Sequence, residues 1–239
     1  MNKNASTKVA IVTGASRGIG ADVAEALAID GYVTAIVARS ADGLKQVAKR
    51  ISANKAVASP VICYPVDVQD HAAVQRLVAD VHSKFGRIDL LFNNAGIGML
   101  GTTDVSIEDY DKTLAINLRG AFSFLKGVVP IMKAQRNGYI FNLASRAGKT
   151  GFAEYGVYCA SKFGMVGLSE SLYHELGPLG IKVTAICPSW VDTDMAKMSG
   201  LEKEEMINTS DLVSTVRWLL SLSPAAVVKD LTIECRKAL

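Results

Sequence analysis

The sequence predicts an α/β protein, a doubly wound parallel sheet with helices on both faces, in one domain that spans residues 1–239. Three observations predict it. Short apolar runs alternate along the chain with longer segments of helical pattern, as in repeated strand–helix–strand units. Most of these runs are continuously apolar, as expected of a parallel sheet that is covered on both faces. A glycine-rich turn joins the first run to the first helix.

The predicted strands are the runs KVAIVT (8–13), YVTAIVA (32–38), VICYPV (61–66), IDLLFN (88–93), YIFNLA (139–144), IKVTAIC (181–187) and DLTIEC (230–235). The predicted helices between them cover residues 19–30, 41–54, 70–85, 106–135, 156–177 and 210–221. Right-handed crossovers between parallel strands leave few possible topologies. Residues 189–209 break the alternation, because three methionines and a tryptophan lie among charges there. We interpret this segment as a helical flap on the substrate side of a site.

Composition excludes several classes of protein. The net charge of +3 is too small to indicate binding to nucleic acid or to a membrane surface. No apolar segment of the kind found in signal peptides follows a basic start, so we expect no signal peptide, and no uninterrupted apolar run reaches transmembrane length. The four scattered cysteines suit reduced thiols in or near a core, and the three histidines suit the surface. We therefore expect a cytoplasmic protein without a metal site.

The turn TGASRGIG (13–20) predicts a nucleotide site. Gly14, Gly18 and Gly20 follow the first strand and open the first helix. Glycines allow a tight turn and a close approach of the backbone to a pyrophosphate, which then meets the helix N-terminus. Glycines alone also suit a structural turn, but their place between strand and helix favours the nucleotide.

The end of the second strand indicates which nucleotide binds. Where an acid would bind the ribose 2′-hydroxyl of NAD, this chain has Arg39, and Arg17 lies within the glycine turn. Two arginines attract a 2′-phosphate, so the sequence favours binding of NADP(H). The alternative is that both side chains face solvent and bind no nucleotide. Asp67, after the third strand, is placed to accept from the adenine amino group or to cap the next helix.

Tyr158 and Lys162, in the stretch YCASK, are spaced to share one face of a helix. A free tyrosine has a pKa of about 10, which is high for proton exchange near neutral pH. A neighbouring ammonium favours the phenolate, so we expect Lys162 to bring the pKa of Tyr158 closer to working pH. The alternative is that the two side chains lie on the surface and have no catalytic role.

The ordered set of TGASRGIG, NNAG (93–96), Asn117, Ser145 and YCASK resembles the short-chain dehydrogenase/reductase family over nearly the whole chain. The resemblance implies a seven-stranded Rossmann sheet, a nicotinamide cofactor, and redox chemistry between a small-molecule carbonyl compound and its alcohol. It also implies a homodimer or homotetramer, often packed through the long helices, here 106–135 and 156–177. The alternative is that the outer face of these helices contacts only solvent and no second subunit.

The resemblance also implies roles for individual residues. Tyr158 is the catalytic acid/base, Lys162 holds the nicotinamide ribose, and Ser145 donates to the substrate oxygen. Asn117 helps to hold a water linked to the lysine, and a role as a helix cap is compatible with this one. Asn94 chiefly supports the sheet, and Thr193 contacts the carboxamide. The implied cofactor-binding residues are Gly14, Ser16, Arg17, Gly18, Ile19, Gly20, Arg39, Asp67, Val68, Asn94, Ala95, Gly96, Tyr158, Lys162, Pro188, Val191 and Thr193.

Some positions depart from the family pattern. Ser189 replaces the usual glycine after Pro188, and Trp190 is either a pocket wall or a core residue. The C-terminal run DLTIECRKAL lacks a glycine pair that many tetrameric members carry. We therefore expect a dimer at least as much as a tetramer.

The substrate is less constrained. Family members of this length often reduce 3-oxoacyl groups on an acidic acyl carrier protein, which needs basic residues beside the pocket mouth. Lys133 and Arg136 are candidates for these contacts, although Leu179 replaces a second arginine. Arg146 and Lys149 are candidates for binding a small carboxylate. The candidate apolar pocket walls are Met99, Phe152, Tyr155, Trp190, Met195 and Met198.

Two functions remain: an NADPH-dependent carbonyl reductase, and a non-catalytic NADP(H)-binding sensor or scaffold. The complete set Asn117, Ser145, Tyr158 and Lys162 favours the enzyme, because a protein that only binds nucleotide needs no lysine beside a tyrosine.

Overall fold

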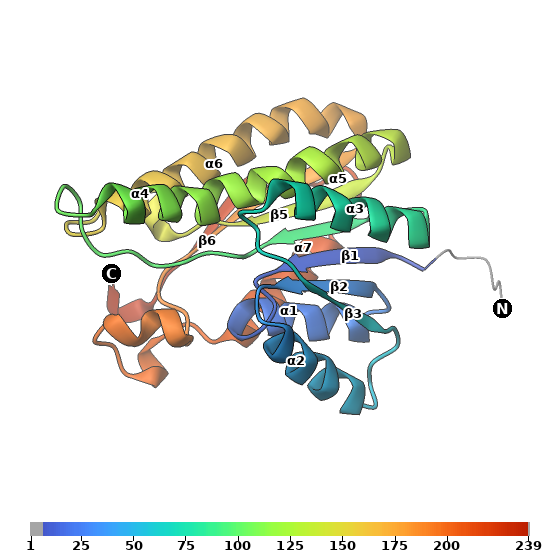
Figure 1. The fold of residues 1–239 in the computed structure, drawn as a ribbon, viewed down its shortest axis with the longest axis horizontal. Coiled ribbons are helices and arrows are strands. Elements are labelled where there is room, and N and C mark those ends of the chain that lie inside the picture. The colour runs from blue at the N-terminus through green and yellow to red at the C-terminus, as the bar shows by residue number, and fades with distance from the viewer. Residues whose placement is uncertain (1–6, 239) are drawn as a thin grey trace.

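Seven parallel strands form one sheet in the order β3-β2-β1-β4-β5-β6-β7 (Figure 1). The computed structural model describes residues 7–238. The strands are β1 Val9–Thr13, β2 Val33–Ala38, β3 Val61–Pro65, β4 Leu90–Asn93, β5 Gly138–Leu143, β6 Ile181–Pro188 and β7 Asp230–Ile233. The strand order reverses between β1 and β4, which pair with each other. Ligands of doubly wound sheets bind at such a switch point, beyond the carboxyl ends of the strands.

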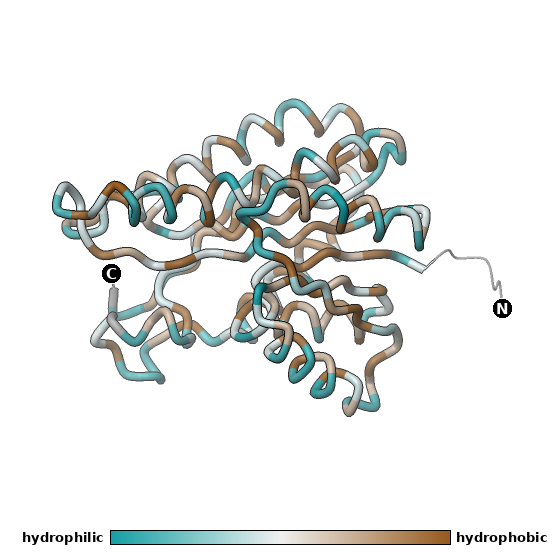
Figure 2. The backbone as a smooth tube through the Cα atoms, viewed as in Figure 1, coloured by the Kyte–Doolittle hydropathy of each residue, from teal (hydrophilic) through white to brown (hydrophobic). Residues whose placement is uncertain are grey.

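Helices cover both faces of the sheet (Figure 1). One layer contains α1 Gly18–Ile29, α2 Ala41–Ala53 and α7 Thr209–Ser221, and the other contains α3 His71–Phe85, α4 Ile107–Leu114, α5 Ala121–Gln135 and α6 Gly156–Leu176. Two large apolar clusters fill the space between the sheet and these layers. Figure 2 shows the hydrophobic positions concentrated in the central strands and the hydrophilic ones on the outer turns of the helices. The predicted fold class and the order of its elements are confirmed.

The predicted helix 106–135 is not one regular α-helix. A π-helical stretch, Ala115–Gly120, separates α4 from α5. Ser106 caps α4 by accepting a hydrogen bond from the Asp109 amide at 3.1 Å. The continuous helical segment Ile107–Gln135 is long and apolar enough to cross a membrane by length and composition, but half of its apolar window is buried inside the fold. The expectation that no run reaches transmembrane length therefore needs this qualification, and core packing accounts for the buried half of the window.

The segment 189–209 contains less helix than we expected. Two short 3₁₀ turns, Asp194–Met198 and Lys203–Glu205, are separated by Gly200 at φ +72°. The ends of the segment meet in a parallel bridge between Val191 and Ile207. A left-handed glycine between two short turns interrupts helix propagation, so the segment forms a bridged loop.

Candidate active site

A cleft of about 1390 Å³ lies beyond the carboxyl ends of the central strands. The 189–209 segment forms one of its sides. The predicted residues that line it are Gly14, Ser16, Arg17, Gly18, Ile19, Arg39, Asp67, Val68, Asn94, Ala95, Gly96, Ser145, Tyr158, Lys162, Pro188, Val191 and Thr193. Gly20 and Asn117 are the two predicted site residues outside this lining. The fold thus brings residues from most of the chain length to one side of the sheet.

The glycine turn is held against the NNAG segment by Asn94. Its Nδ2 donates to the carbonyl oxygens of Thr13 at 2.8 Å and Gly14 at 3.2 Å. A Cβ at Gly14, where φ is +66°, would lie 2.6 Å from this nitrogen, and one at Gly20 would lie 2.5 Å from it. Gly20 is therefore a packing glycine beneath the turn, which explains its absence from the cleft surface.

The N-terminus of α1 is suited to an anion. Arg17 occupies the N-cap position, and its side chain makes no capping hydrogen bond. The first amides of α1 therefore lack a side-chain acceptor at the edge of the cleft, and the helix dipole adds partial positive charge there. Gly18, at φ +54°, leaves room beside the Thr193 methyl group, which would lie 3.2 Å from an added Cβ. A nucleotide pyrophosphate fits this arrangement.

The two arginines differ in their surroundings. Arg39 is exposed at the end of β2 and has no ion pair with any residue that the structure describes. Arg17 Nε lies 3.5 Å from Asp194 Oδ2, in an exposed pair that joins the glycine turn to the 189–209 segment. Asp67 accepts from the Gln69 amide at 2.9 Å, whereas Asp70 caps α3. The alternative in which Asp67 caps the helix is wrong.

Tyr158 and Lys162 lie one turn apart near the start of α6. Lys162 Nζ donates to the carbonyl oxygen of Leu143 at 3.0 Å and lies 5.7 Å from the centre of the Tyr158 ring. Ser145 follows β5, and its Oγ accepts from the Ala147 amide at 3.1 Å. All three side chains line the same part of the cleft.

The pKa values differ from our expectation. Burial raises the pKa of Tyr158 to about 12, and the hydrogen bond with Ser145 only partly opposes this. Burial also lowers the pKa of Lys162 to about 8. The prediction that Lys162 brings Tyr158 closer to working pH is therefore wrong for the protein alone. Lys162 is hydrogen-bonded to the backbone, and desolvation is the largest influence on the pKa of the phenol, which Ser145 and not the lysine opposes.

Asn117 lies in the π-helical stretch and is 1% exposed. Its Oδ1 accepts from the Ile97 amide at 2.8 Å, and its Nδ2 donates to the Ile97 carbonyl at 2.9 Å and to Ser161 Oγ at 3.1 Å. It does not cap a helix, so the expectation of that second role is wrong. A Cβ on Gly96 would lie 3.3 Å from Asn117 Oδ1 and 3.7 Å from Lys162 Nζ. Gly96 thus allows the asparagine and the lysine to approach the cleft backbone.

The substrate end of the cleft is mainly aromatic and apolar. The rings of Tyr155 and Trp190 meet edge to face at a centroid distance of 6.3 Å. Trp190 lines the cleft and also packs against the core, so both alternatives for it hold. Phe152, Met195 and Met206 complete this wall. The predictions missed Met206, because only the bridge between Val191 and Ile207 brings it back to the cleft.

Two candidate wall residues do not join this end of the cleft. Met99 is absent from the lining. The side chain of Met198 lies outside the described part of the chain.

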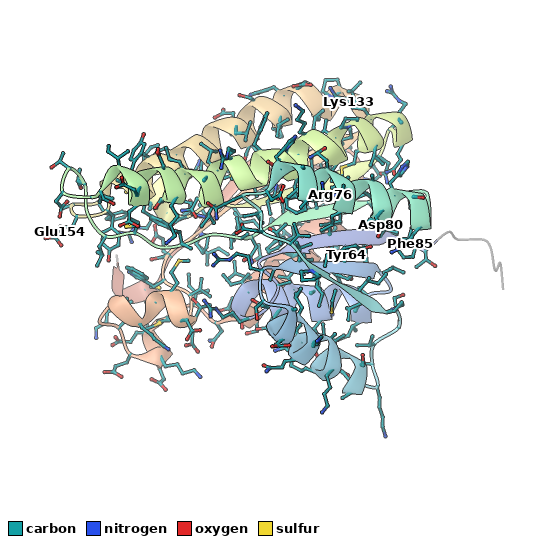
Figure 3. The ribbon with its side chains drawn as sticks, viewed as in Figure 1. Tyr64, Arg76, Asp80, Phe85, Lys133 and Glu154 are labelled. Carbon is teal, nitrogen blue, oxygen red and sulfur yellow. The ribbon has the colours of Figure 1, made fainter. Side chains whose placement is uncertain are left out.

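The candidate basic contacts are placed differently from our expectation. Lys133 Nζ pairs with Glu175 at 2.7 Å, and Arg136 lies between α5 and the first residue of β5, away from the cleft. Figure 3 shows Lys133 at the opposite end of the molecule from Glu154, whose chain neighbours Ala153 and Tyr155 line the cleft. The expectation that Lys133 and Arg136 flank the cleft of their own chain is wrong, because the amino ends of parallel strands face away from it.

The residues that follow Ser145 are already paired. Arg146 Nη1 bonds Glu234 Oε2 at 2.8 Å and its guanidinium lies 4.8 Å from the centre of the Phe152 ring, while Lys149 pairs with Asp230 at 2.7 Å. Carboxylates therefore already balance the two charges that we considered for a small anionic substrate.

The remaining polar groups indicate no other site. Cys159, Cys187 and Cys235 are buried free thiols and Cys63 is partly buried. His71, His82 and His174 are exposed. Within residues 7–238, no three His, Cys, Asp or Glu side chains are grouped to hold a metal.

Comparison with known proteins supports one family. A family model for short chain dehydrogenase matches residues 8–204. The chain is 40% identical to D-threitol dehydrogenase of Mycolicibacterium smegmatis, over 79% of this chain and 72% of that protein. It is 36% identical to 3-oxoacyl-[acyl-carrier-protein] reductase FabG of Staphylococcus aureus, over 90% of this chain and 91% of that protein.

Solved structures agree. The structure of a betaketoacyl-[ACP] reductase (FabG) from Bacteroides thetaiotaomicron has a TM-score of 0.86 and 43% identity, with 98% of each chain covered. A metagenomic short-chain oxidoreductase in complex with NADP has a TM-score of 0.82 and 29% identity, over 95% of this chain and 96% of that one. The matching family model, the fold and these relatives lead to one conclusion: the chain belongs to the short-chain dehydrogenase/reductase family of oxidoreductases.

Proposed function

We propose that this enzyme uses NADPH to reduce a ketone or related carbonyl compound to an alcohol, with Tyr158 as the proton donor. The observation that carries the proposal is the course of one continuous cleft. It begins at the glycine turn and the exposed Arg39, and it ends at Ser145, Tyr158 and Lys162 beside an aromatic wall. A nucleotide that fills the first part would bring its nicotinamide to the second.

The chain offers a contact for each part of NADP(H). The N-terminus of α1 would hold the pyrophosphate, and Arg39, joined by Arg17, would hold the 2′-phosphate. Asp67 and Val68 would contact the adenine, and Pro188, Val191 and Thr193 would contact the nicotinamide. When bound, the cofactor supplies the hydride. The bound NADP of a structural neighbour supports this choice over NAD.

The remaining chemistry belongs to the protein. Tyr158 stays protonated at neutral pH, because burial raises its pKa to about 12, as a proton donor in reduction requires. Ser145 would donate to the same carbonyl oxygen and stabilise the charge that develops there. Lys162 would supply positive charge behind the tyrosine, and Asn117 would orient a water that links the lysine to solvent.

The wall beside these residues suits an uncharged, largely apolar carbonyl compound. Phe152, Tyr155, Trp190 and Met206 offer aromatic and thioether surface, and Arg146 is neutralised by Glu234. A 3-oxoacyl thioester remains a candidate, since two of the relatives are 3-oxoacyl reductases. We further propose that residues 189–209 are a flap that covers the substrate, because Trp190, Met195 and Met206 all come from this segment.

Tyr158→Phe tests the proposal. NADPH oxidation would be followed by nicotinamide absorbance against 3-oxoacyl thioesters, diketones, quinones and aldehydes. We expect Tyr158→Phe to lower kcat by at least about 100-fold while NADPH affinity, measured by fluorescence titration, stays unchanged, because the phenol donates the proton but binds no phosphate. Tyr173→Phe, on the same helix but away from the cleft, is the control and should keep full activity.

Retained turnover in Tyr158→Phe would refute the assignment of the proton donor. Tight NADPH binding by a wild-type protein that is silent across the whole panel would instead favour the non-catalytic sensor.

A further inference from the structure

Three buried polar side chains link the sheet to α6 behind the catalytic residues. Asn93 Nδ2 on β4 donates to Asn142 Oδ1 on β5 at 2.9 Å, and Asn142 Nδ2 donates to Ser169 Oγ on α6 at 2.9 Å. Ser169 Oγ in turn donates to the Met165 carbonyl oxygen at 2.6 Å. We call Asn93, Asn142 and Ser169 the buried bracket. Each of the three residues is at most 3% exposed.

Stability alone does not explain the bracket. Polar groups inside an apolar core must be fully hydrogen-bonded to avoid a cost in free energy. Asn93 Oδ1 is buried and has no hydrogen-bond partner among the described residues. Apolar side chains of similar size would avoid this loss, so the bracket needs another reason.

The bracket and the catalytic lysine share one face of α6. Lys162 and Ser169 are seven residues apart, which is two helical turns. Both bond adjacent residues of β5, because Ser169 accepts from Asn142 while Lys162 donates to the carbonyl oxygen of Leu143. Helix α6 is therefore attached to one short stretch of strand by two directional contacts.

Directional contacts matter because other buried side chains of α6, such as Met165 and Leu176, are apolar. Hydrophobic contacts such as those of Met165 do not define how far a helix has slid along a sheet. The turn after Ser145 also touches α6 directly, since a Cβ on Gly148 would lie 2.6 Å from the Lys162 carbonyl oxygen. A small shift of α6 would therefore change the position of Tyr158 relative to Ser145.

We propose that Asn142 and Ser169 are positioning residues: their hydrogen bond sets the register of α6 on β5 and thereby places Tyr158 and Lys162 opposite Ser145. This inference rests on the reductase function proposed above. Misplacement of reacting groups by about 1 Å lowers rates by up to about 100-fold. Loss of the hydrogen bond should therefore reduce kcat and leave the binding of substrate and NADPH nearly intact.

The experiment compares Ser169→Ala with Ser171→Ala. Ser171 lies on the same helix and makes the same kind of bond, to the Gly167 carbonyl oxygen at 3.0 Å, but it is exposed. With the best substrate of the panel above, we expect Ser169→Ala to lower kcat about tenfold, with KM and the NADPH dissociation constant within about twofold, and Ser171→Ala to match wild type. Asn142→Leu should behave like Ser169→Ala, and the double variant should lose no more than either single variant.

Amide hydrogen exchange over residues 156–164 gives a readout that needs no turnover. We expect faster exchange in Ser169→Ala than in Ser171→Ala. This result is expected even if the wild-type protein reduces no substrate, and in that case the proposed function fails while the positioning role stands. If Ser169→Ala does not fold, Ser169→Cys retains a weak hydrogen-bonding group and should show the same changes in smaller degree. Unchanged kcat together with unchanged exchange in a folded Ser169 variant would overturn the inference. A wild-type kcat accompanied only by a lower Tm would overturn it as well, because the bracket would then be purely structural.

Discussion

Lys162 is a basic side chain that is 5% exposed and bonded to a backbone carbonyl oxygen. Burial lowers its pKa from 10.5 to about 8. The shift corresponds to about 3 kcal/mol against the charged form. A residue that is kept at such a cost points to function, because an apolar side chain of similar length would pack there without this penalty.

The pH dependence of reduction follows from this lysine. Lys162 is protonated below about pH 8 and loses its charge above it. Tyr158 remains protonated over the same range, because its pKa is about 12. We expect kcat/KM for NADPH, which reports on groups of the free enzyme, to be level below about pH 8 and to fall above it. Steady-state rates between about pH 6 and pH 10 measure this.

The titration of Lys162 does not itself destabilise the folded protein over this pH range. The folded pKa of Lys162 lies below its unfolded value, so between about pH 8 and 10.5 the unfolded chain binds more protons than the folded one. This group therefore makes the protein more stable as pH rises through that window. Circular dichroism in the same buffers is the control. A level rate profile up to about pH 10 would contradict a role for the charged lysine.

Arg39→Asp tests the nucleotide preference. An acid at this position would accept from the ribose 2′-hydroxyl of NADH and repel a 2′-phosphate. We expect the ratio of kcat/KM for NADPH to that for NADH to fall by about 100-fold, since one charge-assisted contact is lost and a repulsion is gained. Arg76→Asp, on α3 (Figure 3) and outside the cleft lining, makes the same charge change and should leave the ratio unaltered. An unchanged ratio in Arg39→Asp would remove the support for NADP(H).

At the scale of elements, the π-helical stretch between α4 and α5 decides the position of Asn117. A π-helical turn departs from the regular i→i−4 hydrogen bonding of the helix, and such turns are frequent at functional sites. Asn117 is then bonded to both backbone groups of Ile97, on the segment that carries Gly96. A regular helical period from 106 to 135 does not predict this orientation.

In the 189–209 segment the composition predicts more helix than the structure contains. Its residues come back to the cleft through the Val191–Ile207 bridge and through Cys235, whose Sγ lies 3.0 Å from the Trp190 carbonyl oxygen. The exposed pair of Arg17 and Asp194 adds a link to the glycine turn. Exposed ion pairs contribute little stability, so this link adds little to the Val191–Ile207 bridge in holding the segment.

For the whole molecule, the outer side of α4, α5 and α6 exposes several large apolar side chains. Ile107 is 71% exposed, Phe122 49% and Phe163 45%. Beside Phe122 lies a groove of about 910 Å³, which apolar residues such as Leu118 and Leu168 and charged residues such as Asp111 and Arg119 also line. Exposed apolar clusters of this kind mark interaction surfaces. We expect this face to pair with a second copy of the chain, in a homodimer or as part of a homotetramer.

Phe122→Glu tests this pairing. A buried unpaired carboxylate would strongly weaken a self-complementary interface, so we expect monomers in sedimentation velocity at concentrations where the wild-type protein is oligomeric. Trp218→Glu is the matched control, because Trp218 is 51% exposed on α7, on the other face of the sheet. It should leave at least a dimer. Wild-type sedimentation of Phe122→Glu would contradict the assignment of this face.

Much of the architecture is readable in the sequence, because its signals are local. Continuous apolar runs such as residues 8–13 predict buried parallel strands, and the spacing of Tyr158 and Lys162 predicts a shared helix face. The spacing of Gly14, Gly18 and Gly20 between the first strand and the first helix predicts the glycine turn. These patterns were sufficient to predict the fold class and to collect most of the residues that line the cleft.

The properties that the sequence did not determine depend on groups far apart in the chain. The pKa of Tyr158 is set by desolvation within the assembled cleft, and Lys162 is oriented by Leu143, nineteen residues away. Lys133 and Arg136 turned out to face away from the cleft, because the direction of β5 decides which edge of the sheet they join. A local pattern determines which element forms and which residues share a face. Only tertiary packing decides which distant groups exclude water from a side chain, and therefore its charge.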